Sequence, residues 1–192
     1  MTPLVPRPDV LDFLRTRRSR PAKTLHAPGP DRDALMPLLD AALRVPDHGK
    51  LEPWRLMILG PDTRAALAEL TQSRGGRRGE DPDKLAKARA MFADAPAMVA
   101  VAATPVNSPK IPEGEQVLSA GAVCLSLVNA ALAAGWGANW LTGWMATDRD
   151  FLTAGLGLGH GFVAGWIVIG TEGAVPPDRP RPNLAQKVDW HP

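Results

Sequence analysis

Residues 115–147 read EQVLSAGAVCLSLVNAALAAGWGANWLTGWMAT, and no charged side chain follows Glu115 over the next 32 positions. This stretch predicts a long apolar helix over Glu115–Ala134, which Gly135-Trp136-Gly137 then breaks. A membrane span is the alternative, but glycines, serines and asparagines lie within the run, and Lys or Arg does not flank it closely. A helix that is apolar nearly all round is usually buried. We therefore expect it in a core or a subunit interface.

The composition around this stretch is that of an ordinary globular protein. A chain of 192 residues has room for one sizeable core, so we expect a single domain over residues 1–192. The 45% hydrophobic content and the net charge of +2 argue against a disordered chain and give no charge argument for a nucleic-acid partner. One cysteine cannot form an internal disulfide, and Met1–Pro8 lacks the apolar core of a signal peptide. We expect a soluble, cytoplasmic protein.

The rest of the chain alternates helical and strand patterns. Helices are predicted over Val10–Arg17, from the N-cap Asp31 to Pro46, over Thr63–Thr71, over Asp83–Ala93 and from the N-cap Asp148 to Gly155. Strands are predicted over Trp54–Leu59, Ala97–Ala103 and Phe162–Gly170. A mobile Gly-rich loop is expected at Ser73–Gly79, and a Pro-rich tail over about 176–192. The order of elements predicts an α+β domain with a mixed sheet.

Several common kinds of site are disfavoured by the sequence. The four histidines are scattered, without partners at metal-ligand spacing, so we expect no metal site. Cys124 lies inside the apolar helix, where a thiol is usually a small core residue. The glycines of 155–161 follow a helix and precede a strand, which is the reverse of a dinucleotide-binding order. No nucleophile motif is present, so we expect no catalytic side chain.

Three stretches remain as candidates. Arg17-Arg18-Ser19 lies at a helix-to-loop junction, and two guanidinium groups with a hydroxyl can hold a phosphate; a solvated basic turn is the alternative. Arg44 and His48 lie on a loop that Pro46 and Pro53 make rigid, so the loop either presents cationic donors to an electron-rich ligand or is an ordinary surface loop.

The third stretch is the Trp- and Gly-rich run 135–144. Its glycines make a continuous helix unfavourable, although Trp136, Trp140 and Trp144 have helical spacing. Tryptophans separated by glycines suit a wall where the backbone approaches a flat ligand closely. Core packing of each Trp is the alternative.

Together, and in this order, the three stretches resemble the nitroreductase superfamily of FMN-dependent oxidoreductases, in particular its short NAD(P)H nitroreductase subgroup. The matching motifs are R-R-S at 17–19, R-V-P-D-H at 44–48 before P-W-R, and G-W-G-A-N-W-L-T-G at 135–143. The resemblance runs from about Val10 to the prolines near 180. It implies an α+β fold with a mixed, largely antiparallel sheet wrapped by helices, in an intertwined homodimer with FMN at the subunit interface.

The resemblance also implies roles for individual residues. Arg17, Arg18 and Ser19 would hold the FMN phosphate and ribityl end, and Arg44 and His48 would come from the opposite subunit. Trp140, Leu141, Thr142 and Gly143 match the segment that lines the flavin, and Arg181 in the tail would add a positive charge. The flavin itself would carry the chemistry, passing a hydride from NAD(P)H to a nitroaromatic, quinone or similar acceptor by a ping-pong cycle.

The sequence departs from the family pattern at several positions. Gly49 follows His48, Glu52 precedes the P-W pair, and Leu141 stands where relatives often have Arg. Because that Arg is absent, the alternative stays open that the protein binds or scavenges flavin without catalytic turnover. An RNA-binding module that uses the basic runs 15–20 and 74–78 is a second alternative. The physiological acceptor and the choice between NADH and NADPH stay open.

Overall fold

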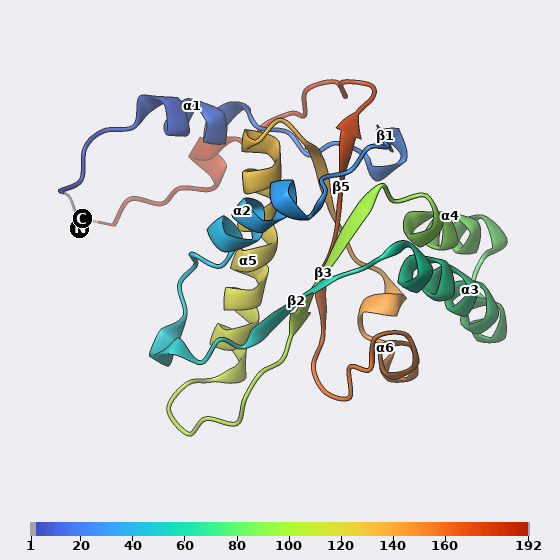
Figure 1. Cartoon of the computed structure of the whole chain (residues 1–192). Helices are drawn as coiled ribbons and strands as arrows, with labels where there is room; N and C mark the ends of the chain where they lie inside the picture. Colours follow the sequence, from blue (N-terminus) through green and yellow to red (C-terminus); the bar gives the residue numbers. More distant parts are fainter. Residues whose placement is uncertain (1–2, 192) are drawn as a thin grey trace.

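An antiparallel sheet lies at the centre of the molecule and separates two groups of helices (Figure 1). The computed structural model describes residues 3–191. The helices are α1 (Pro8–Thr16), α2 (Arg32–Ala42), α3 (Pro61–Arg78), α4 (Pro82–Ala93), α5 (Glu113–Ala133) and α6 (Arg149–Leu156). The strands are β1 (Leu25–His26), β2 (Trp54–Ile58), β3 (Ala97–Ala103), β4 (Gly137–Leu141) and β5 (Phe162–Glu172). In Figure 1, α2 and α5 lie on one side of the sheet, and α3, α4 and α6 lie on the other.

The long strand β5 is the centre of the sheet. The strand order is β1-β5-β3-β2, and β4 also pairs with β5, every pairing being antiparallel. Successive side chains of β5 point to opposite faces, so Trp166 packs with the α3, α4 and α6 side, whereas Ile167 packs with the α2 and α5 side. The predicted α+β class and the largely antiparallel sheet implied by the resemblance are confirmed. The described strands form antiparallel pairs throughout, without the parallel pair that a mixed sheet would contain.

Each face of the sheet has its own hydrophobic core. On one face, the Trp166 ring meets the Phe92 ring edge-on at a centroid distance of 5.0 Å, and Phe151 packs beside Phe92 at 6.0 Å. On the other face, aliphatic side chains of α2 and α5 cover the sheet, among them Leu39 and Leu127. The sheet is therefore buried on both sides, which explains why Ala97–Ala103 is apolar throughout and was predicted with the correct bounds.

The expected mobile loop at Ser73–Gly79 is wrong, because α3 continues through it to Arg78. A Cβ on Gly75 would overlap the Leu85 Cδ1, so this glycine lets α3 and α4 pack closely instead of breaking the helix. The left-handed Gly79, with φ of 71°, ends the helix. Strand β4 was also missed, because it forms from part of the Trp- and Gly-rich run by pairing with β5.

Helix α5, which carries no charged side chain after Glu115, has the length and apolar composition of a membrane span. In this structure it packs on α2 and against β3, β4 and β5, as the core helix of a globular domain does. Its outward face carries Leu118, which is 75% exposed, and Leu125, which is 47% exposed. Phe13 of α1 lines a shallow groove together with Asn129 and Ala133 of the C-terminal half of α5.

Candidate functional site

The Arg17-Arg18-Ser19 segment is held in place beside the beginning of β4. The Arg20 backbone N–H donates to the Ala138 carbonyl at 2.9 Å, and the Asn139 side-chain amide donates to the Arg20 carbonyl at 2.7 Å. Arg20 also forms an ion pair with Glu172 at the end of β5. These contacts fix the segment just beyond the C-terminal end of α5.

Positive charge is concentrated in this segment. The Arg17 guanidinium donates to the Ser19 Oγ at 3.0 Å, and Arg18 donates to the Ser19 carbonyl at 3.3 Å. The Nε atoms of both arginines are buried, without a hydrogen-bond partner among the described residues. Burial lowers the pKa of Arg17, and the neighbouring charges of Arg18 and Arg20 lower it further. An anion bound here would reduce the repulsion between the arginines and accept hydrogen bonds from the donors that lack a partner.

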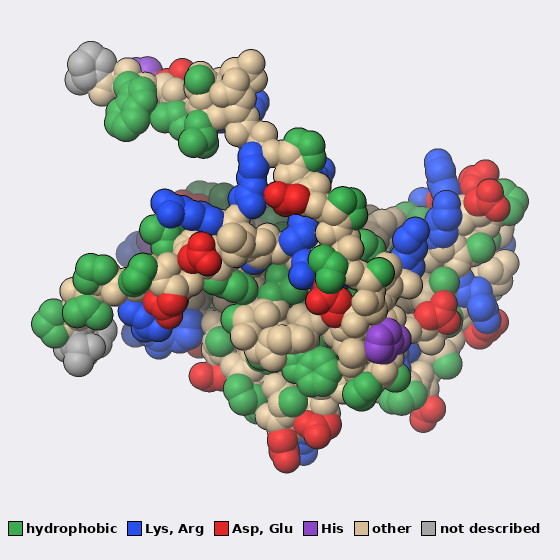
Figure 2. Space-filling view, turned by 90° about the horizontal axis from the view of Figure 1, so that it is seen from above, with side chains coloured by type: hydrophobic (Ala, Val, Ile, Leu, Met, Phe, Trp, Pro, Cys, Tyr) green, Lys and Arg blue, Asp and Glu red, His purple; other side chains and the backbone are tan. Residues whose placement is uncertain are grey.

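The C-terminal tail returns to the same place. A cavity of about 230 Å³ lies between the Arg17–Ser19 segment and residues 178–182 of the tail, and it contains Arg179, Arg181 and the single carboxylate of Asp178. Figure 2, which views the molecule from above, shows Lys and Arg side chains gathered near the middle of the molecule. Two extended chain segments leave the body near them. The structure thus brings Arg181 to the three residues predicted to hold a phosphate. Their donor set fits a phosphate group.

Trp140 lies on β4 and faces the α5 side of the sheet. Its Nε1 donates to the Ala164 carbonyl at 2.9 Å, and the residue is 38% exposed. Gly165 makes room for the ring, since a Cβ there would meet Trp140 and would lie 2.8 Å from the Cys124 Sγ. Burial raises the pKa of that thiol to about 12, which agrees with a core role for Cys124.

The three residues after Trp140 do not share its surroundings. The Leu141 side chain packs into the core on the opposite face of the sheet. Any contact of Leu141 with a ligand beside Trp140 would therefore come from its backbone. Thr142 is exposed, and Gly143 has a φ of 125°, a conformation that favours glycine.

The loop that carries Arg44 and His48 is strongly ordered by its own backbone contacts. The Asp47 carboxylate accepts hydrogen bonds from the backbone N–H groups of Leu51 at 3.2 Å and Glu52 at 2.8 Å. Gly49, Lys50 and Glu52 have φ values of 72°, 53° and 48°, which make the loop turn sharply. The rigidity expected from the two prolines thus has a further source in Asp47.

Three contacts attach this loop to the N-terminal half of α5. The Ser119 hydroxyl donates to the Pro46 carbonyl at 2.7 Å and accepts from the Trp54 Nε1 at 3.1 Å. The His48 Nδ1 lies 2.8 Å from the Glu115 Oε2. This pairing holds the imidazole ring while leaving His48 mostly exposed, as Arg44 also is. The sequence analysis missed Glu115 as the partner of His48, because 67 residues separate the two.

The predicted site residues therefore lie in two groups, and one chain does not bring His48 to the Arg17–Ser19 segment. His48 contacts α5 at Glu115, near the N-terminal end, whereas the Arg17–Ser19 segment lies beyond Ala133, the C-terminal end. At a rise of about 1.5 Å per residue, Glu115 and Ala133 are about 27 Å apart along the helix axis. Figure 1 shows α1 at the top of α5 and the loop after α2 near its bottom.

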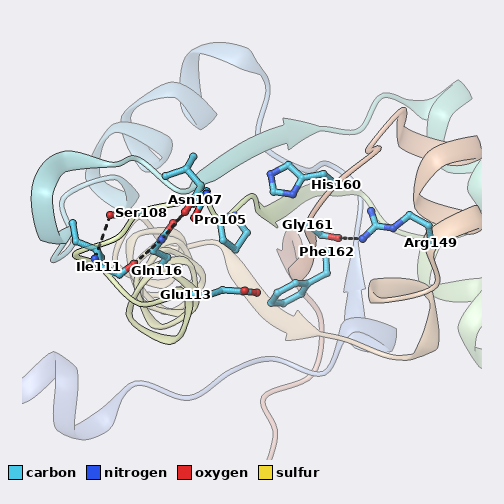
Figure 3. Close-up of a pocket in the computed structure, with 11 residues that line it drawn as sticks. Pro105, Asn107, Ser108, Ile111, Glu113, Gln116, Arg149, His160, Gly161 and Phe162 are labelled. Atoms are coloured by element: carbon cyan, nitrogen blue, oxygen red, sulfur yellow. Dashed lines mark hydrogen bonds between the residues drawn. The ribbon is translucent and has the colours of Figure 1, made fainter.

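A polar cavity of about 450 Å³ lies at the N-terminal end of α5, beside the loop 105–111 (Figure 3). The buried Gln116 fixes this loop by accepting from the Val106 N–H at 2.9 Å and donating to the Val106 carbonyl at 3.0 Å. In Figure 3 the Glu113 side chain points toward the Phe162 ring. The described residues that line this cavity include none of the predicted site residues.

Comparison with known proteins now gives the family. The model of the nitroreductase family matches residues 14–171. The chain belongs to the nitroreductase family. The Escherichia coli K12 protein named "Putative NAD(P)H nitroreductase YdjA" is 32% identical to this family member over 135 residues, which cover 70% of this chain and 73% of that protein. The family resemblance inferred from the three motifs is confirmed.

Solved structures share the nitroreductase fold over almost the whole chain. A nitroreductase-like family protein from Bacillus cereus has a TM-score of 0.76 at 22% identity, covering 100% of this chain and 98% of that chain. A nitroreductase with bound FMN from Bacteroides fragilis has a TM-score of 0.72 at 19% identity, covering 95% and 98%. These likenesses confirm the predicted fold.

Proposed function

We propose that the protein binds FMN and acts as an NAD(P)H-dependent oxidoreductase. In this reaction a hydride passes from NAD(P)H through the flavin N5 to a nitroaromatic, a quinone or a similar acceptor, in a ping-pong cycle. The observation that carries the proposal is the arginine cavity, which Arg17, Arg18 and Arg181 line and in which the buried Nε atoms of Arg17 and Arg18 lack hydrogen-bond partners among the described residues. Membership of the nitroreductase family and the names of its relatives support it.

Each predicted residue has a place in this proposal. Arg17, Arg18, Ser19 and Arg181 would hold the FMN phosphate through charge-assisted hydrogen bonds. Trp140 would lie against the flavin, with backbone groups of Leu141, Thr142 and Gly143 beside it. A backbone or cationic donor near the pyrimidine edge would stabilise negative charge on the reduced ring. FMN supplies the redox chemistry when bound, so no protein nucleophile is required.

We further propose a homodimer with two such sites at the subunit interface. His48 lies too far along α5 to join Arg17 within one chain, so we propose that it and Arg44, which is on the same loop, serve the site of the partner. The outward face of α5, on which Leu118 and Leu125 are exposed, supports burial against a second copy. We expect one FMN-binding domain over residues 1–192 and a cytoplasmic location, where reducing conditions suit a chain with one free, buried thiol.

The test is the colour and turnover of the purified protein. We expect a yellow protein with the absorbance bands of FMN, which oxidises NADH or NADPH when a quinone or a nitroarene is supplied. A yellow protein without turnover would favour the flavin-binding alternative. A colourless protein that FMN does not reconstitute would contradict the proposal.

A further inference from the structure

A further cavity, of about 490 Å³, lies away from the arginine cavity, between α2, the end of β2 and the first turn of α3. Its walls are largely apolar, with Leu35, Met36 and Leu39 from α2 facing Ile58 at the sheet edge. Met36 and Ile58 are each more than half exposed, at 53% and 57%, so the cavity is open to solvent. Among the described residues, none lines both this cavity and the arginine cavity.

One partly buried cation, Arg64, lines this apolar space. One of its Nη atoms donates to the Leu59 carbonyl at 2.8 Å, whereas its Nε is buried without a partner in the described chain. No described carboxylate lies within 4.0 Å of this guanidinium. Burial accordingly lowers the pKa of Arg64.

Other charges around the cavity favour an anion. The Asp31 carboxylate also lines it but accepts the Ala34 N–H at 2.9 Å as the N-cap of α2. Arg32 adds a second cation, and the cavity lies at the N-terminal end of α3, where the helix dipole is positive. A cation without a counterion in an apolar cavity favours a ligand that carries a single negative charge on an apolar group.

We propose that this cavity binds a small apolar carboxylate, such as a medium-chain acyl or aromatic acid. The carboxylate pairs with the free donors of Arg64, and the apolar body lies between Met36 and Ile58. A phosphate is a poorer fit, since the walls offer few further donors for a dianion, in contrast to the arginine cavity. This site is independent of flavin binding and of the proposed oxidoreductase activity.

The experiment compares octanoate with octanol, two probes with the same number of carbon atoms and different charge. Isothermal titration calorimetry on the full-length protein measures both affinities. We expect octanoate to bind more tightly than octanol, and Arg64→Gln to weaken octanoate by about 10- to 100-fold, the size expected for a lost charge-assisted hydrogen bond. The matched control is Arg77→Gln, which removes an exposed arginine of the same helix and leaves octanoate binding unchanged.

A second measurement on the unmutated protein locates the ligand whether or not the variant folds. In methyl NMR spectra, octanoate is expected to shift the signals of Met36, Ile58 and Met98, which line the cavity, and to leave Met145 unmoved. Equal affinities for octanol and octanoate, an unchanged affinity in folded Arg64→Gln, or unmoved Met36 and Ile58 signals would overturn the proposal. Binding of octanoate only after removal of residues 176–192 would also overturn it, because the tail of a second copy would then be the occupant.

Discussion

At the scale of single residues, the crowded positive charge at Arg17 is the feature that most directly predicts a ligand. Arg17→Ala and Ser19→Ala are each expected to weaken FMN binding by about 1.5–3 kcal/mol, because each removes a donor to the phosphate. Fluorescence titration with FMN measures this loss. Arg15→Ala, on the exposed face of α1, is the matched control and leaves affinity unchanged. An unchanged affinity in Arg17→Ala would place the phosphate elsewhere.

Asp148 gives a prediction about pH. Its carboxylate accepts the Phe151 N–H at 2.9 Å and lies 2.8 Å from Arg74 and 3.0 Å from Arg78. Burial raises the pKa of Asp148, but the hydrogen bond from Phe151 and the charges of Arg74 and Arg78 outweigh it, so the pKa lies below its ordinary value. The ionised carboxylate therefore stabilises the fold fully above the ordinary carboxyl pKa of about 4, and this stabilisation is lost as pH falls through the lowered folded-state pKa.

Asp148→Asn is accordingly expected to lower the free energy of unfolding by about 1–2 kcal/mol at pH 7, at the low end for charged hydrogen bonds because Arg78 is partly exposed. It should also flatten the fall in stability below about pH 4. Urea unfolding at several pH values measures both effects. Asp150→Asn is the control, since that side chain is 77% exposed and contacts Arg74 alone among the described arginines. Equal losses of unfolding free energy in the two variants would show that the burial of Asp148 and its second arginine partner add nothing to stability.

At the scale of elements, two adjacent glycines of α3 have opposite roles. Gly75 faces α4, where a Cβ would overlap the Leu85 side chain, whereas a Cβ on Gly76 would meet nothing within 4 Å. We expect Gly75→Ala to lower the free energy of unfolding by about 1–2 kcal/mol through overpacking. Gly76→Ala should raise it by up to about 1 kcal/mol through helix propensity. Denaturant unfolding of both variants tests this, and stabilisation by Gly75→Ala would show that Leu85 moves aside at no cost.

The same elements show what the sequence could and could not predict. Strand β3 and helix α5 were predictable, because local hydrophobicity alone identifies a buried run. The continuation of α3 through Gly75 was not, because its cause is contact with Leu85 of the next helix. Strand β4 depends likewise on its partner β5 rather than on an alternating pattern of its own.

The candidate site shows the same division. The Arg17-Arg18-Ser19 motif was visible because its members are adjacent in sequence. The meeting of this motif with Arg179 and the pairing of His48 with Glu115 depend on how distant segments fold back. The placement of Leu141 in the core follows from strand alternation, which the sequence analysis did not apply to a segment that it had not assigned to a strand.

At the scale of the whole molecule, the separation of the two groups of site residues predicts that each FMN site is shared between two subunits. We expect an Arg17→Ala/Ser19→Ala chain and an Arg44→Ala/His48→Ala chain each to form a nearly inactive homodimer. In a mixed dimer, one site would collect all four substitutions and the other would be fully wild type, so co-expression should restore part of the FMN binding and activity. If all four residues served one site within a single chain, each site would carry two substitutions. Mixed dimers that form without recovery would contradict the shared site.

Because Glu115 and Ala133 are about 27 Å apart along α5, the proposed site needs two chains, and cofactor retention is expected to depend on protein concentration. A flavin held by two chains is released when they separate, so by mass action the bound fraction depends on how much dimer is present. Serial dilution at a constant ratio of FMN to protein is expected to release fluorescent FMN more steeply than a site within one chain would. By reciprocity, added FMN should raise the fraction of dimer in dilute solution, which sedimentation measures. Bound FMN would then stabilise the dimer that forms its own binding site.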